Sequence, residues 1–234
     1  MKKSVFFGLL MSLCLSAAFA GDVATFVDKG FTEDGKYYVF GQYGKTDKTF
    51  QGWAEIYQVD IAANEWVDNG VFRTRPSAVT ADKDGKDVYE ALEAKSYYHF
   101  KNMKCEPANP DHTLYILDDI NKKGTDEIVF KDFRASNIDN PVSYHIQLVP
   151  TIKGKGKNAS SSFYISVEKK DSTGKVLTKK KVGSPDIVRK GVTEYKIERI
   201  VCDKAGKSLI FVIEKTIEDD KGISIRYMIE TTKF

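Results

Sequence analysis

The sequence predicts a mostly β fold with a single helix, in which antiparallel meanders form either a sandwich or a propeller-like arrangement. Three observations predict it. About eleven segments are rich in β-branched and aromatic residues, several with the polar–apolar alternation of half-buried strands. Turn sequences rich in Gly, Asp, Asn and Lys separate these segments. One stretch, residues 87–103, contains few strand formers and neither Gly nor Pro, which favours a helix.

The first 20 residues predict a signal peptide and not a part of the fold. A basic start, an apolar core over residues 5–15 and an A-x-A cleavage site ending at Ala20 are typical of such segments. Lipidation at Cys14 is the alternative, but the bulky residue before that cysteine disfavours it. The apolar run is too short for a comfortable membrane span. We therefore expect an exported protein, periplasmic or secreted, with one β-rich domain over residues 21–234 and no transmembrane segment.

Residues 30–72 predict a three-stranded antiparallel meander. A Gly-containing turn leads into an aromatic strand at residues 37–40, because glycine tolerates the positive φ that many turns need. Residues 53–61 alternate between two faces, and residues 65–72 return after a short turn. We expect a buried cluster from this meander, with contributions from Tyr38 or Phe40, Ile56 or Tyr57, and Trp66.

The predicted helix near residues 87–103 is expected to start at Asp84 or Asp87, because aspartate is a favoured N-cap. One stripe of this helix is expected to contain Val88, Ala91, Leu92, Lys95, Tyr98 and the stem of Lys101. After the helix, strands are expected at residues 113–117, 127–133, 142–152, 161–169, 176–182, 194–201, 208–217 and 223–232.

Two distant segments, residues 32–61 and 202–232, share one plan. Each has a turn with an acidic residue, Gly and Lys, then an apolar strand, a polar loop and a second strand. Repeats at fixed spacing would indicate a propeller. Because the two copies lie at opposite ends of the chain, they could be the first and last blades of a propeller or the two edges of one β-sandwich.

Charge is distributed unevenly along the chain. The whole chain carries +3, which argues against a nucleic-acid partner. Residues 21–140 contain 15 basic and 22 acidic residues, whereas residues 141–234 contain 19 and 11. These counts correspond to net charges of −7 and +8. Either two charged halves attract each other within the fold, or a basic surface binds an acidic polymer or partner.

The N-terminal half resembles the bacterial "predicted secreted protein" family called domain of unknown function 2259. The resemblance rests on a spaced pattern: Phe31, Asp34-Gly35, Phe40, Tyr43-Gly44, Asp47, Ala54-Glu55-Ile56, Asp60, Asn64 and Trp66. A local likeness to WD40-like β-propeller repeats covers part of the same stretch. In the C-terminal half the matching residues are Arg189, Gly191, Tyr195, Glu218, Gly222, Arg226 and Tyr227, but the family's cysteine is absent. The resemblance implies export and a fold, and it carries no activity.

No catalytic or metal-binding motif is present. The three histidines lack metal spacing, and H-E-x-x-H, G-x-S-x-G and P-loop patterns are absent. Asp119, Asn121, Gly124 and Glu127 are spaced as positions 1, 3, 6 and 9 of a calcium loop, but Lys123 occupies a ligand position. The weak candidate metal ligands are Asp119, Asn121, Asp126 and Glu127. A polar hairpin turn is the alternative. No cofactor is expected.

Three aromatic residues, Trp53, Tyr57 and Trp66, are the candidate ligand-binding residues, because aromatic platforms bind sugars; a role in the core is the alternative. Two cysteines, Cys105 and Cys202, are the candidate disulfide in an oxidising compartment, with buried thiols as the alternative. These features favour a non-catalytic envelope module that binds an unknown envelope protein or a glycan. The rival is an envelope hydrolase whose site assembles only on folding.

Overall fold

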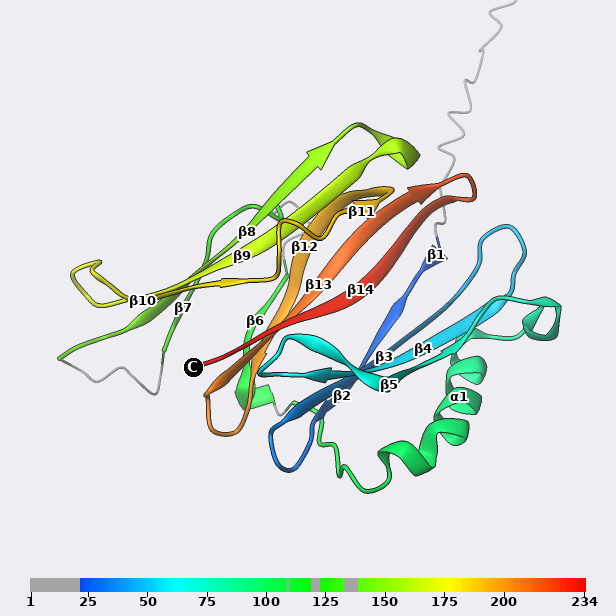
Figure 1. Cartoon of the computed structure of the whole chain (residues 1–234), viewed down its shortest axis with the longest axis horizontal. Coiled ribbons are helices and arrows are strands. Elements are labelled where there is room, and N and C mark those ends of the chain that lie inside the picture. Colours follow the sequence, from blue (N-terminus) through cyan, green and yellow to red (C-terminus); the bar gives the residue numbers. More distant parts are fainter. Residues whose placement is uncertain (1–21, 109, 119–122, 133–138) are drawn as a thin grey trace, which may run out of the picture.

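The computed structural model describes residues 22–108, 110–118, 123–132 and 139–234, which form three stacked β-sheets and an outer helix (Figure 1). The central sheet contains, in spatial order, β1 (Asp22–Val23), β14 (Gly222–Lys233), β13 (Ser208–Asp219), β12 (Val192–Cys202) and β6 (Thr113–Ile116). The upper sheet contains β10 (Val176–Val182), β9 (Ser160–Lys170), β8 (Ser143–Lys153) and β7 (Ile128–Lys131), with β11 (Arg189–Lys190) also paired to β9. The lower sheet contains β2 (Thr25–Phe31), β3 (Tyr37–Lys45), β4 (Gly52–Asp60) and β5 (Glu65–Thr74).

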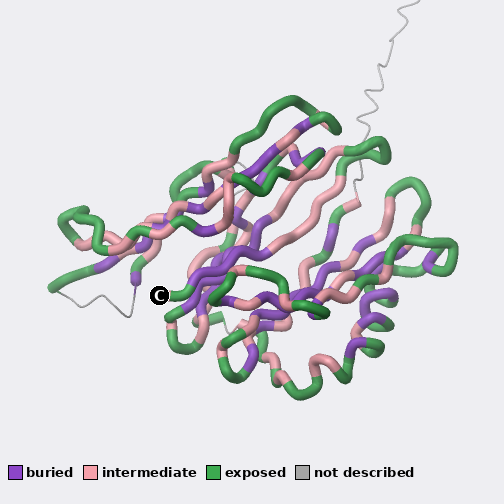
Figure 2. The backbone as a smooth tube through the Cα atoms, viewed as in Figure 1, coloured by how far each residue is buried: buried purple, intermediate pink, exposed green. Residues whose placement is uncertain are grey.

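The central sheet is buried on both faces, as the apolar run of β13 requires. Leu209, Phe211 and Ile213 point into a cluster shared with the upper sheet. Ile210 and Val212 point the other way, into a cluster shared with the lower sheet. Because neighbouring strand residues alternate between faces, a continuous apolar run is what a strand between two layers needs. Figure 2 shows buried residues along the middles of the strands and exposed residues at the hairpin tips.

The helix α1 (Gly85–Phe100) covers the outer face of the lower sheet. Its N-cap is Asp84, whose side chain accepts a hydrogen bond from the backbone N–H of Lys86 at 3.2 Å. Val88 and Leu92 are buried as expected. Ala91, Lys95, Tyr98 and Lys101, in contrast, are exposed, Tyr98 to 84%, so their placement on the buried stripe was wrong. The helix ends at Phe100, three residues before its predicted end.

In the part of the chain that the structure describes, the mostly β fold with one helix of several turns is confirmed. All eleven predicted strands are present, and three further strands, β1, β2 and β11, were not predicted. The meander of β3, β4 and β5 is confirmed, and β2 extends it to four strands. The two segments that share one plan contain the hairpins β3–β4 and β13–β14, which pack face to face in one cluster. The sheets are therefore layered as in a sandwich and not set around an axis.

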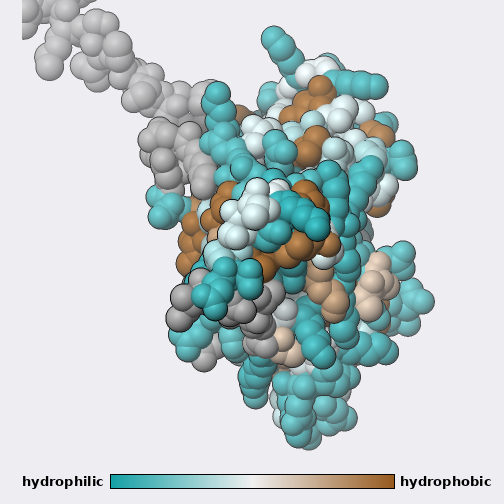
Figure 3. Space-filling model, turned by 90° about the vertical axis from the view of Figure 1, so that its left-hand side faces the viewer, coloured by the Kyte–Doolittle hydropathy of each residue, from teal (hydrophilic) through white to brown (hydrophobic). Residues whose placement is uncertain are grey.

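The short helical turns η1 (Ala78–Thr80), η2 (Pro110–His112) and η3 (Gly156–Asn158) lie in the connections. Within the described residues, no helix is both long and apolar enough to cross a bilayer. Figure 3 views the end of the molecule where the C-terminus lies, and shows a mainly hydrophilic surface interrupted by small apolar patches.

Candidate functional site

The β4–β5 turn and the segment from β10 to β11 approach β14 of the central sheet (Figure 1). A cleft of about 730 Å³ is lined by residues of these three parts of the chain and by Lys215. We call it the β14 cleft. Its lining includes backbone and side chains from four parts of the chain: residues 62–66, 180–189, Lys215 and residues 228–233. The charged residues among them are Lys180, Lys181, Arg189, Lys215 and Lys233 against Glu65 and Glu230. Positive charge therefore predominates in the cleft.

Asn64 fixes one wall of the β14 cleft. It has a positive φ of 56° in the β4–β5 turn, a conformation that asparagine tolerates better than most residues. Its side-chain amide donates to Glu230 Oε2 at 2.6 Å, and its Oδ1 accepts from the backbone N–H of Thr231 at 2.6 Å. These bonds join the turn of the lower sheet to the outer edge of β14. Two side-chain hydrogen bonds of Asn64 therefore hold this wall of the cleft in place.

Glu230 lies at the bottom of the β14 cleft and is only 6% exposed. Burial raises the pKa of this carboxyl, and the contacts with Asn64 and Arg189 oppose the rise. Arg189 approaches Glu230 Oε1 at 3.9 Å. Gly183 lies close by with φ +77°, and a Cβ there would be 3.3 Å from the Glu230 carboxylate. Glycine is therefore the residue that this approach allows without strain.

Lys215 places an amine in the wall of the β14 cleft from inside the central sheet. Its side chain is half-buried, and no described residue supplies a hydrogen bond or an ion pair to Nζ. Burial lowers the pKa of Lys215 to about 8, and the positive charge of Arg189 adds to the lowering. An ammonium without a carboxylate partner at such a position is energetically costly, so it is a candidate for a functional group.

Of the three candidate aromatic residues, Trp66 is the one whose side chain is accessible to solvent. It lines the β14 cleft and is 53% exposed, so the prediction that it belongs to the buried cluster was wrong. One side of the ring lies against Tyr57, with centroids 5.2 Å apart. The guanidinium of Arg73 lies 5.9 Å from the Trp66 ring and 5.4 Å from the Tyr57 ring. Trp66 is therefore supported from behind and accessible from the cleft.

Tyr57 is a core residue. It is 6% exposed and stacks on Phe40, with ring centroids 4.9 Å apart. Its hydroxyl donates to Glu55 Oε2 at 2.6 Å. Burial, together with the Glu55 charge, raises the pKa of Tyr57 to about 12. The residue supports Trp66 but offers no accessible face of its own.

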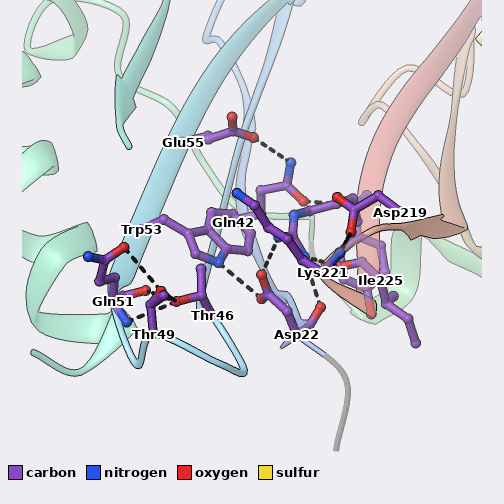
Figure 4. Close-up of polar contacts among 12 residues, drawn as sticks. Asp22, Gln42, Thr46, Thr49, Gln51, Trp53, Glu55, Asp219, Lys221 and Ile225 are labelled. Carbon is purple, nitrogen blue, oxygen red and sulfur yellow. Dashed lines mark hydrogen bonds and ion pairs between the residues drawn. The ribbon is translucent and has the colours of Figure 1, made fainter. Parts of the chain in front are cut away.

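Trp53 also has a structural role, in a polar network at the edge of the central sheet (Figure 4). Its indole N–H donates to Asp22 Oδ1 at 3.0 Å, and the Arg226 guanidinium lies 4.0 Å above its ring. Arg226 pairs with Asp22 Oδ2 at 2.5 Å. Because Asp22 begins β1, this network holds the parallel pair of β1 and β14 in place. At 4% exposure Trp53 presents no platform to a ligand.

A second group of polar residues lies on the solvent-facing side of the upper sheet. Ser143 Oγ is 3.0 Å from His145 Nε2, and His145 Nδ1 is 2.9 Å from Glu127 Oε1. This is the contact order of a nucleophile, a base and an orienting carboxylate. However, β8 pairs with β7 on one side and β9 on the other, so its backbone N–H groups are used within the sheet. The group lies outside the β14 cleft.

The structure describes two of the four metal-ligand candidates, Asp126 and Glu127. Asp119 and Asn121 lie outside the described residues. Asp126 Oδ2 accepts from the backbone N–H of Lys123 at 2.9 Å, and Glu127 pairs with His145. No group of three metal-ligating residues occurs in the described ranges.

The two cysteines lie in different layers. Cys202 belongs to the core between the central and upper sheets, whereas Cys105 packs against the cluster beneath α1. Both are thiols in the structure and not a disulfide, contrary to the predicted pairing. The intervening central and lower sheets explain the difference, because a bridge requires Cα atoms within about 7 Å.

The fold and the cleft together define a layered β protein with a polar cleft that is lined by one accessible tryptophan. Lys215, Arg189 and Glu230 were not among the candidate site residues from sequence. Two signals existed: a lysine inside the apolar strand at residues 208–217, and Arg189 among the residues of the family pattern. A model of the family described as "Predicted secreted protein", domain of unknown function 2259, matches residues 39–233, and the chain belongs to that family. No curated protein matches the chain, and no solved structure matches it.

Proposed function

We propose that this protein is a non-catalytic binding protein that acts outside the cytoplasm and holds its ligand in the β14 cleft. The observation that carries the proposal is the exposed Trp66 at the wall of a cleft that also presents charged side chains. Ligand sites combine apolar or aromatic surface with a few placed polar groups. An envelope glycan is the ligand class that we favour, because an exposed indole ring provides a flat apolar face for a sugar ring.

The experiment uses Trp66 as its own reporter. The chain contains two tryptophans, so a Trp53→Phe variant leaves Trp66 as the single source of indole fluorescence. We expect that neutral and acidic oligosaccharides added to this variant protect Trp66 from acrylamide quenching. Trp66→Ala should abolish binding measured by calorimetry, whereas Tyr98→Ala, an exposed aromatic on α1, should leave it unchanged. If a broad set of envelope saccharides leaves the quenching unaltered, the proposal fails, and capture of an envelope protein through the same face would replace it.

Export is part of the proposal and rests on the family description together with the signal-peptide pattern of residues 1–20. We propose cleavage after Ala20 and a periplasmic or secreted mature chain. The mass of the protein recovered from the extracytoplasmic fraction tests this. A mass that begins at Gly21 agrees with the proposal, and a lipid-modified chain that begins at Cys14 contradicts it.

A hydrolase is the second candidate, and the contact between Ser143, His145 and Glu127 is the observation in its favour. In that function Ser143 Oγ would attack a carbonyl while His145 takes its proton. The exposed position on a paired strand leaves no spare backbone donors for an oxyanion, which is why we place it second. Labelling with a fluorophosphonate decides the matter: modification that disappears in Ser143→Ala supports the hydrolase, and no labelling excludes a reactive serine here.

A further inference from the structure

The charged side chains of the β14 cleft differ in how well they are compensated. Glu230 is engaged at both oxygens, by Asn64 at 2.6 Å and by Arg189 at 3.9 Å. Glu65, the other acidic residue of the lining, lies in the β4–β5 turn region beside Trp66. On the basic side, no described carboxylate lies within ion-pair distance of Lys180, Lys181 or Lys215. The uncompensated charge in the cleft is therefore positive.

The basic residues of the cleft also differ in the hydrogen bonds and cation–π contacts that fix their side chains. Lys180 donates to the backbone carbonyl of Lys233 and lies 4.6 Å over the Phe234 ring. Lys181 lies 4.5 Å over the Tyr164 ring. Arg189 stacks 5.0 Å over Phe163 and donates to a neighbouring backbone carbonyl. Each of these cations has a local partner that fixes it.

Lys215 is the exception, because no partner among the described residues fixes its amine. The charged groups that act on it come from every neighbouring layer: Arg189 of β11, Arg226 of β14, Arg73 of β5 and Glu55 of β4. Three of these four are cations. Arg73 is paired with Glu55 and Arg226 with Asp22, whereas the carboxylate nearest to Arg189 among its ion pairs, Glu230, is 3.9 Å away. A partly buried ammonium without a carboxylate partner is stabilised by an incoming anion, because Coulomb attraction is stronger away from bulk water.

We infer that the ligand of the β14 cleft is an anionic saccharide, whose carboxylate lies between Lys215 and Arg189 while a sugar ring packs against Trp66. The inference rests on the proposed function, because it names the ligand class of the same cleft. Charge-assisted hydrogen bonds from lysine and arginine are the strong contacts that carboxylates make in proteins. Trp66, Lys215 and Arg189 line one cleft, which lets a single short oligosaccharide contact all three.

The test compares two probes that differ only in charge: a tetramer of galacturonic acid, and the same tetramer after its carboxyl groups are reduced. Calorimetry on the mature protein should give tighter binding of the acidic tetramer by about tenfold or more. Lys215→Met should remove this preference and leave the affinity for the reduced tetramer unchanged. Lys215→Arg should keep it. Lys95→Met, an exposed lysine on α1, is the matched control and should change nothing.

The possible results distinguish the anionic ligand class from the proposed glycan-binding function. Equal binding of both tetramers, still lost in Trp66→Ala, would overturn the anionic ligand and leave the glycan-binding function standing. Absence of binding by either tetramer would count against both. Displacement of the acidic tetramer by acetate at the same concentration would assign the site to a simple carboxylate and would overturn the saccharide.

Discussion

Replacing Lys215 by methionine should stabilise the protein, although the same change should weaken ligand binding. The reason is the lowered pKa of this lysine. Burial and neighbouring arginines lower it from 10.5 to about 8, and each pKa unit corresponds to about 1.4 kcal/mol. The charged amine therefore costs the folded state about 3 kcal/mol at neutral pH. Methionine has a side chain of similar length without the charge, so we expect an increase of about 1–3 kcal/mol in the free energy of unfolding at pH 7.

The pH dependence of this difference provides its signature. A lysine whose pKa is lower in the folded state binds fewer protons there than in the unfolded chain. The stability of the wild-type protein therefore rises, through this group, as the pH increases from about 8 towards 10.5. Below pH 8 both states are protonated and the full cost is present. The advantage of Lys215→Met should be greatest at pH 7 and should disappear as the pH approaches 10.5.

Urea denaturation of the two proteins at several pH values measures the effect, and Lys95→Met serves as the control that should shift stability by less than about 0.5 kcal/mol. A methionine variant that is equally stable or less stable at pH 7 would contradict this prediction. A gain that is the same at pH 7 and pH 10 would refute it as well, because packing and not charge would then be its cause.

Three other predictions concern the cleft and the core. Trp66→Ala should cost less than about 1 kcal/mol, against about 3–5 kcal/mol for a buried aromatic, and thermal denaturation that shows a larger loss would return Trp66 to the core. Asn64→Ala should cost about 1–3 kcal/mol, because it removes the donor to the buried Glu230 carboxylate; urea midpoints unchanged from wild type would contradict this. Alkylation of the unreduced, denatured mature protein should label both Cys105 and Cys202, and a mass without two labels would restore the disulfide.

The sequence predicted the strands well because their alternation reflects the two faces of each sheet. β2 was not predicted, because Asp28, Lys29 and Gly30 interrupt its apolar pattern. Asp28 is accommodated in this strand by a contact that the sequence does not show: its Oδ1 accepts a hydrogen bond from the Tyr38 hydroxyl at 2.7 Å. β1 contains two residues, and its parallel pairing depends on the Asp22 network. Short strands of this kind leave no periodic signal.

The position of Trp66 was wrong for a reason within β5. The pairing of β4 and β5 shifts register, so Tyr57 lies opposite Val71 while Val59 lies opposite Trp66. The inserted residues include Asn69, with a positive φ of 58°, and they break the period of two. If β5 were one continuous strand without this bulge, its alternation would place Trp66 on a buried face. The bulge turns the ring towards the β14 cleft.

The β14 cleft could not be predicted, because its residues come from β4, β5, β10, β11, β13, β14 and the turns between them, and they meet only through layer packing. The charge asymmetry of the sequence nevertheless pointed towards it. Some basic residues of the C-terminal half pair with the acidic half, as Arg226 does with Asp22 and Lys204 with Glu106. All five basic residues of the cleft also belong to that half. The two explanations of the asymmetry therefore apply to different residues: attraction between the halves accounts for the compensated cations, and the proposed anionic ligand accounts for Lys215.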